Sequence, residues 1–155
     1  MIWENIKESL IFLGLDGSSR DEILMQMGSA LIREGYAKES YVEALIEREK
    51  NFPTGLSIGT LGIAIPHTEA RYVEKEGIAI GVLKHAVDFG QMGTDDEVTK
   101  VQLVFMLTIK DQGKYVEYLK NLLKVIRDKQ VLERFLDAKS SREMIEIVKE
   151  KEQSM

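Results

Sequence analysis

Residues 101–109, VQLVFMLTI, are almost entirely apolar, and the segments GIAIP (62–66) and GIAIGVL (77–83) share this character. A strand with one solvated face would alternate apolar and polar residues. Continuous apolar runs bounded by glycine, proline or charge instead predict strands that are covered on both faces. We therefore expect a sheet between two layers of helices.

Helical patterns precede these strands. A short apolar run at 10–15 predicts a first strand. Ser19 followed three residues later by Glu22 predicts a capping box, and Gly35 stands where a glycine would end that helix. Residues 38–50 repeat the helical pattern, with apolar residues on one face and charges elsewhere.

The helical pattern returns after residue 111, in two apolar stripes and a last segment that Ser140 and Glu143 would cap. The order of strand, two helices, strands and helices predicts the α/β class. We expect residues 1–155 to form a single domain with a central mixed β-sheet of about five strands, flanked by helices on both faces. The polar segment 90–100 is predicted to be an exposed loop.

The composition excludes several kinds of function. The net charge is −5 and the basic residues form no cluster, so nucleic acid is not an expected partner. The chain has no cysteine, which excludes disulfides, thiolate nucleophiles and zinc–thiolate sites. The two histidines lack ligand partners at metal-binding spacing, and no metal or organic cofactor is expected.

The sequence also predicts a cytoplasmic protein. The first residues have neither a basic segment nor a small-residue cleavage site of the kind found in signal peptides. The apolar runs are far shorter than the ~20 residues that span a bilayer, so no direct membrane insertion is expected.

The segment 55–59 matches the G-x-S-x-G pattern of a hydrolase nucleophile turn, with Ser57 at its centre. Such a turn requires a strand before the serine and a helix after it. Here a predicted helix precedes Ser57 and a predicted strand follows it. We expect a glycine-rich loop in which Ser57 has no chemical role, and a serine hydrolase remains an alternative hypothesis.

His67 is the stronger candidate for chemistry. It follows Pro66 at the end of an apolar strand, where sheets commonly present functional groups. Neutral imidazole is a competent nucleophile near pH 7. The other histidine, His85, is expected in a surface loop without a chemical role.

Four blocks carry a family resemblance over essentially the whole chain: REKNFPTGL (48–56), GIAIPHTEARYV (62–73), IAIGVLKHAVDFGQMG (78–93) and VQLVFMLTIKD (101–111). In this order and spacing they resemble the enzyme IIA domain of the bacterial phosphoenolpyruvate-dependent sugar phosphotransferase system. The type is the fructose/mannitol/galactitol one, and the resemblance is greatest to the galactitol-specific branch.

The resemblance implies a phosphocarrier. His67 would accept a phosphoryl group, on Nε2, from the carrier protein HPr and pass it to a cysteine of a sugar-specific enzyme IIB, which works with the membrane enzyme IIC. Arg48 would stabilise the phosphoryl group, since a guanidinium matches phosphate oxygens. Tyr115 stands where many members have a second histidine, and a phenol can hydrogen-bond a phosphoryl oxygen but does not readily exchange protons near pH 7.

Three further expectations follow from the resemblance. The sugar would be galactitol or a related polyol. The partners would dock on an apolar rim around His67 that includes Gly55, Leu56 and the loop 90–98. Glu69 should point away from the imidazole or lie at the rim, because a phosphorylated histidine would repel it. The alternative function is a regulatory protein that signals its phosphorylation state through protein contacts.

Overall fold

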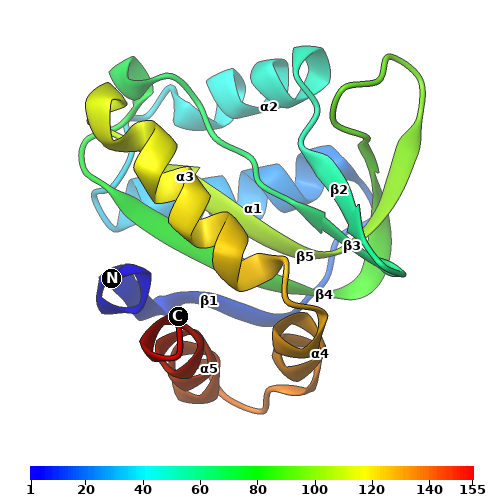
Figure 1. The fold of residues 1–155 in the computed structure, drawn as a ribbon. Coiled ribbons are helices and arrows are strands. Elements are labelled where there is room, and N and C mark those ends of the chain that lie inside the picture. The colour runs from blue at the N-terminus through cyan, green and yellow to red at the C-terminus, as the bar shows by residue number, and fades with distance from the viewer.

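In the computed structural model, which describes residues 1–155, five strands form one mixed sheet in the order β1-β4-β5-β3-β2 (Figure 1). β1 pairs with β4, and β3 with β5, in parallel, whereas β4 with β5 and β2 with β3 run antiparallel. The strands are Ile6–Leu15 (β1), Gly55–Ile58 (β2), Leu61–Ala64 (β3), Gly77–Gly90 (β4) and Val98–Thr108 (β5).

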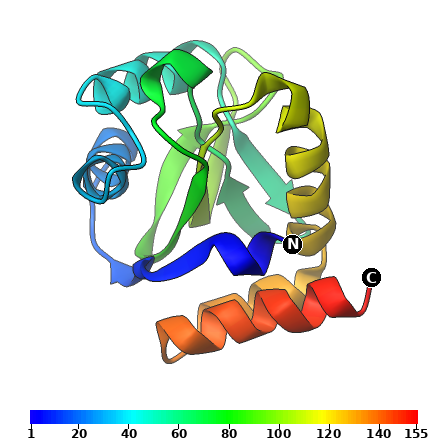
Figure 2. The ribbon, with the colours of Figure 1, turned by 90° about the vertical axis from the view of Figure 1, so that its left-hand side faces the viewer.

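Five helices cover the two faces of this sheet. α1 (Arg20–Arg33) and α2 (Tyr41–Asn51) lie on one face, and α3 (Gln112–Ile126) lies on the other, as Figure 2 shows from the side. α4 (Lys129–Asp137) and α5 (Ser141–Gln153) complete the layer of α3. The predicted α/β class, with a mixed five-stranded sheet between helices, is confirmed. No helix combines the length and apolarity that crossing a bilayer requires.

The alternation of side chains along β5 explains why its sequence is apolar throughout. Leu103, Phe105 and Leu107 enter the core beneath α3, α4 and α5. The intervening Val104 and Met106 enter a second core beneath α1 and α2. All five are fully buried, because successive side chains point to opposite faces and both faces are covered.

The predicted helix signals are found in the structure. The Ser19 hydroxyl accepts from the Glu22 backbone N–H at 3.2 Å, and the Ser140 hydroxyl accepts from that of Glu143 at 3.1 Å. Each glutamate side chain in turn accepts from the N–H one residue before the capping serine, which differs slightly from the standard box. Gly35 has φ +83°, the left-handed conformation that ends a helix.

Two local predictions were wrong. Residues 55–58 form the edge strand β2 rather than a loop, because a tight turn with φ +63° at Gly59 folds them back against β3. His85 lies in β4 rather than in a loop, since this strand continues through an irregular pairing between Val82 and Val87 as far as Gly90. His85 is nonetheless exposed.

Candidate functional site

His67 follows β3 at the edge of the sheet where β3 and β5 end and β2 begins, and the backbone before it is held on both sides. The Ile65 N–H donates to the Thr54 hydroxyl at 3.1 Å. The Pro66 carbonyl accepts from the Leu107 N–H at 3.0 Å, which continues the pairing with β5. His67 is therefore presented by a fixed segment rather than by a loose loop.

The two ring nitrogens of His67 have different partners. Nδ1 lies 2.9 Å from the Ile65 carbonyl oxygen. A carbonyl can only accept, so Nδ1 carries the proton and Nε2 holds the lone pair. The Tyr115 hydroxyl, from the first turn of α3, lies 3.0 Å from Nε2 and donates to that lone pair. The geometry makes Nε2 the nucleophilic atom.

The surroundings of His67 keep its imidazole neutral. Burial lowers the pKa of His67, and the positive charge of Arg48 lowers it further, whereas the hydrogen bond to Ile65 acts in the opposite direction. A histidine with a lowered pKa is unprotonated at neutral pH. The lone pair on Nε2 is then available for attack on an electrophile.

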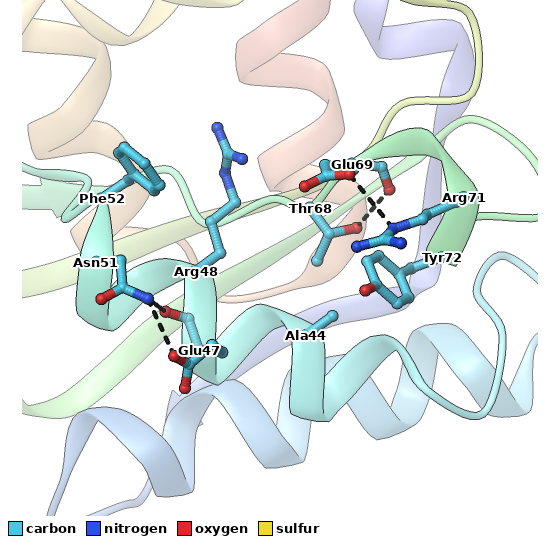
Figure 3. A pocket seen from close by; sticks show the side chains of 9 residues that line it. All are labelled: Ala44, Glu47, Arg48, Asn51, Phe52, Thr68, Glu69, Arg71 and Tyr72. Atoms are coloured by element: carbon cyan, nitrogen blue, oxygen red, sulfur yellow. Dashed lines mark hydrogen bonds and ion pairs between the residues drawn. The ribbon is translucent and has the colours of Figure 1, made fainter.

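Arg48 supplies a positive charge without a carboxylate partner. Its guanidinium lies over the Phe52 ring at 5.2 Å and forms no ion pair. Arg48 belongs to the last turn of α2, and Figure 3 shows its side chain lying apart from those of Glu47 and Glu69. The Glu47 carboxylate accepts a hydrogen bond from Asn51, and the Glu69 carboxylate forms an ion pair with Arg71. Arg48 can therefore bind an incoming anion.

A recess of about 210 Å³ opens beside Arg48 (Figure 3). Its lining is mixed in charge and consists of Ala44, Glu47, Arg48, Asn51, Phe52, Thr68, Glu69, Arg71 and Tyr72. Glu69 is exposed and forms an ion pair with Arg71 at 3.3 Å. Its carboxylate pairs with Arg71 and forms no ion pair with His67, and the expectation that it lies at the rim of the site stays a prediction.

Sequence reasoning missed a buried carboxylate behind the site. Glu49, 1% exposed, accepts from the Thr54 N–H at 2.7 Å and from the Thr54 hydroxyl at 2.8 Å. Burial raises its pKa to about 7, against the hydrogen bonds from Thr54 and the charges of Arg20 and Arg48. Its spacing offered a signal, because it follows buried Tyr41 and Leu45 at intervals of four residues.

The structure brings three of the predicted site residues together and leaves two others apart. His67 contacts Tyr115 directly, with ring centroids 5.6 Å apart, and the charge of Arg48 lowers the pKa of His67. Ser57 is exposed in β2, and the β3 strand rather than a helix follows it. That context does not form a nucleophile turn. His85 has no hydrogen-bond partner in this region.

The loop between β4 and β5 lies next to the start of β2. The Met92 N–H donates to the Gly55 carbonyl at 2.8 Å, and Gly55 forms a bridge with Gln91. Two large apolar side chains are exposed: Phe52, shortly before β2, by 63%, and Met92, in the loop between β4 and β5, by 45%. Exposed apolar groups of this size are consistent with a surface for protein contacts.

Comparison with protein families matches residues 4–151 to the family described as "Phosphoenolpyruvate-dependent sugar phosphotransferase system, EIIA 2". The chain is 31% identical over 150 residues to the mannitol-specific enzyme IIA component of Bacillus subtilis, a match that covers 95% of this chain and 94% of that protein. It is 29% identical over 120 residues to the galactitol-specific EIIA component of Escherichia coli K12, covering 77% and 79%.

Another relative is the transcriptional regulator ManR of Bacillus subtilis, 35% identical over 108 residues. That match covers 70% of this chain but only 15% of the regulator, so the chain corresponds to a small part of that protein. Among solved structures, the complex of mannitol enzyme IIA with phosphorylated enzyme IIB from Escherichia coli has a chain with a TM-score of 0.78 and 26% identity. The match covers 92% of this chain and 96% of that one.

The raised pKa of Glu49 predicts a pH-dependent stability that the Glu49→Gln variant lacks. Below pH 4.5, the ordinary pKa, the carboxyl is protonated in both folded and unfolded protein. Between pH 4.5 and about 7 the unfolded chain loses this proton first, so the folded state loses stability as the pH rises. Relative to Glu49→Gln, the wild type should lose up to about 3 kcal/mol across this window. Urea unfolding at several pH values measures it, and a flat or rising difference would contradict it.

Proposed function

The chain belongs to the EIIA 2 family of phosphotransferase domains, and we propose that it is a phosphocarrier of the sugar phosphotransferase system. Phospho-HPr would phosphorylate His67, and a cysteine of a sugar-specific enzyme IIB would then receive the phosphoryl group. We further propose that residues 1–155 form a single EIIA domain, of which the family match covers 4–151.

The observation that carries this proposal is the state of the His67 ring. Nδ1 is bound to the Ile65 carbonyl, and the lowered pKa leaves Nε2 unprotonated at neutral pH, with a lone pair that only the Tyr115 hydroxyl contacts. In the first step this lone pair forms a bond to phosphorus while the bond from phosphorus to the donor breaks. In the second step the thiolate of enzyme IIB attacks phosphorus, and the electron pair returns to Nε2.

Arg48 has the role of charge stabilisation in this proposal. Phosphoryl transfer depends mainly on positioning and on neutralising the charge of the phosphoryl oxygens. A guanidinium whose charge reaches His67 and that forms no ion pair suits that task, and its stacking on Phe52 restricts its movement. No metal or organic cofactor is part of the proposed reaction.

Tyr115 has two roles in succession. In the resting protein its hydroxyl donates to Nε2, so it must leave that atom before phosphorus can bind there. Once a phosphoryl group occupies Nε2, the same hydroxyl can donate to a phosphoryl oxygen. Tyr115 thus takes the position of a second histidine as a hydrogen-bond donor rather than as a proton acceptor.

The proposed partners are HPr and an enzyme IIB that works with the membrane enzyme IIC. We propose that the chain meets both partners in the cytoplasm. The Escherichia coli complex of a similar enzyme IIA with phosphorylated enzyme IIB supports the second of these partners. Both would dock in turn on a rim that includes Leu56 and the loop 90–98. Gly55, which was expected in this rim, is buried and instead accepts from the Met92 N–H of that loop. The exposed Phe52 and Met92 fit a surface of this kind.

For the sugar we propose galactitol or a related polyol. The galactitol-specific and mannitol-specific relatives support the polyol class about equally, at 29% and 31% identity. A second candidate function is regulation through protein contacts, which the likeness to ManR favours. Transfer from the phosphorylated chain to an enzyme IIB, followed by sugar phosphorylation, would favour transport, whereas phosphorylation without such transfer would favour regulation.

Intact mass measurement tests the site of phosphorylation. After incubation with phosphoenolpyruvate, enzyme I and HPr, the wild-type chain should gain one phosphoryl group that is lost in acid. His67→Ala should gain none, because no other side chain offers a neutral nucleophile at this position. His85→Ala and Ser57→Ala serve as controls and should label like the wild type. Labelling that persists in His67→Ala would overturn the proposal.

The Tyr115→Phe variant tests the hydroxyl. The variant should still be phosphorylated on His67, since the nucleophile is intact. The phosphorylated state loses a charge-assisted hydrogen bond and the resting state loses a neutral one, a difference of about 1 kcal/mol. The equilibrium constant for accepting the phosphoryl group should therefore fall by roughly fivefold, as measured against phospho-HPr. An unchanged or higher constant would show that the hydroxyl does not contact the phosphoryl group.

A further inference from the structure

We propose that Glu49 is a positioning residue, which acts through Thr54 and the Ile65 backbone to hold His67 in the orientation that leaves Nε2 free to react. The hydrogen bonds that carry this inference are independent of the proposed function. Only the expected effect on the rate of phosphoryl transfer rests on it. Glu49 does not touch the reacting atoms, because its carboxylate lies against Thr54 within the fold.

Four hydrogen bonds connect Glu49, Thr54, Ile65 and the imidazole of His67. Both carboxylate oxygens accept from Thr54, one from its N–H and the other from its hydroxyl. A hydroxyl has a single proton, so donation to Glu49 turns its lone pairs toward the Ile65 N–H, which donates to it at 3.1 Å. The Ile65 carbonyl then accepts from Nδ1 of His67 at 2.9 Å.

The middle peptide of this segment is fixed by its neighbours. The peptide before Ile65 is anchored by Thr54, and the carbonyl of Pro66 is anchored by Leu107. The Ile65 carbonyl lies between these anchors, and the proline ring that follows has a fixed φ. Loss of the Thr54 anchor frees one side, so the carbonyl can rotate away from Nδ1. The imidazole is then able to carry its proton on either nitrogen.

A carboxylate is the side chain that this position requires. Thr54 presents two donors, and only a carboxylate offers an acceptor to each of them. A glutamine would place its NH₂ group against one donor. Placing an ionisable group at 1% exposure is unfavourable, and an apolar side chain at this point of α2 would avoid that cost. The positive charges that act on Glu49 come from Arg20 and Arg48.

Two substitutions and two controls test this inference. Glu49→Gln keeps the shape but removes one acceptor, and Thr54→Val keeps the volume but removes the hydroxyl. Thr54→Ser restores a hydroxyl and serves as the conservative variant. Glu43→Gln makes the same change as Glu49→Gln at an exposed position of α2. Thermal unfolding identifies the variants that fold.

The primary measurement is the tautomer of His67, from the ¹⁵N chemical shifts of its ring in the free protein, at a pH above the Glu49 pKa of about 7 so that the wild type has a carboxylate there. The wild type, Thr54→Ser and Glu43→Gln should show Nδ1–H, whereas Glu49→Gln and Thr54→Val should show a mixture. The second measurement is the rate of phosphoryl acceptance from phospho-HPr, which should fall by roughly 10- to 100-fold in the same two variants, as expected for a misplaced reacting group.

Each outcome decides the inference. A wild-type tautomer in Glu49→Gln overturns it, even if transfer slows, because the effect would then be structural. If Thr54→Val does not fold, Glu49→Gln alone decides. If His67 of the wild type is never phosphorylated, the proposed function fails, but the tautomer comparison still supports or refutes the positioning role.

Discussion

The hydrogen bond between His67 Nδ1 and the Ile65 carbonyl is the interaction on which the proposed chemistry of this protein depends. It fixes the proton on one nitrogen and leaves the lone pair on the other, so that the ring is a directed nucleophile. Burial and the charge of Arg48 add to this by keeping the ring neutral. Without the bond, the proton could lie on either nitrogen, and the ring would have no fixed reacting atom.

The rest of the fold holds that carbonyl in place. β3 and β5 lie side by side in parallel, and the Leu107 N–H extends their pairing to Pro66. The Leu107 carbonyl in turn accepts from the Tyr41 hydroxyl at 2.9 Å, which connects β5 to the start of α2. α2 also carries Glu49 and Arg48, so one helix provides both an anchor for the backbone and the positive charge. The site is rigid because a sheet covered on both faces supports it.

Much of this could be predicted from the sequence. The continuous apolar runs predicted a covered sheet, since both faces of β5 enter a core. The position of His67 after Pro66 indicated the candidate reactive group, and family resemblance pointed to Arg48 and Tyr115; the roles of these three residues stay predictions. β2 was missed because a four-residue edge strand between glycines is too short to show a clear periodic pattern. Glu49 was missed because a charged residue on a helix is usually solvated, and its burial depends on the chain after α2 turning back so that Thr54 meets the carboxylate.

The nitrogen that carries phosphorus tests the central claim most directly. Long-range ¹H–¹⁵N NMR of the phosphorylated protein, labelled with ¹⁵N in histidine, distinguishes the two phosphohistidine isomers by the shifts of the ring nitrogens. Because Nδ1 is held by the Ile65 carbonyl, phosphorus should be found on Nε2, with Nδ1 still protonated. Phosphorus on Nδ1 would contradict this account, since that atom could react only after leaving the hydrogen bond that orients the ring.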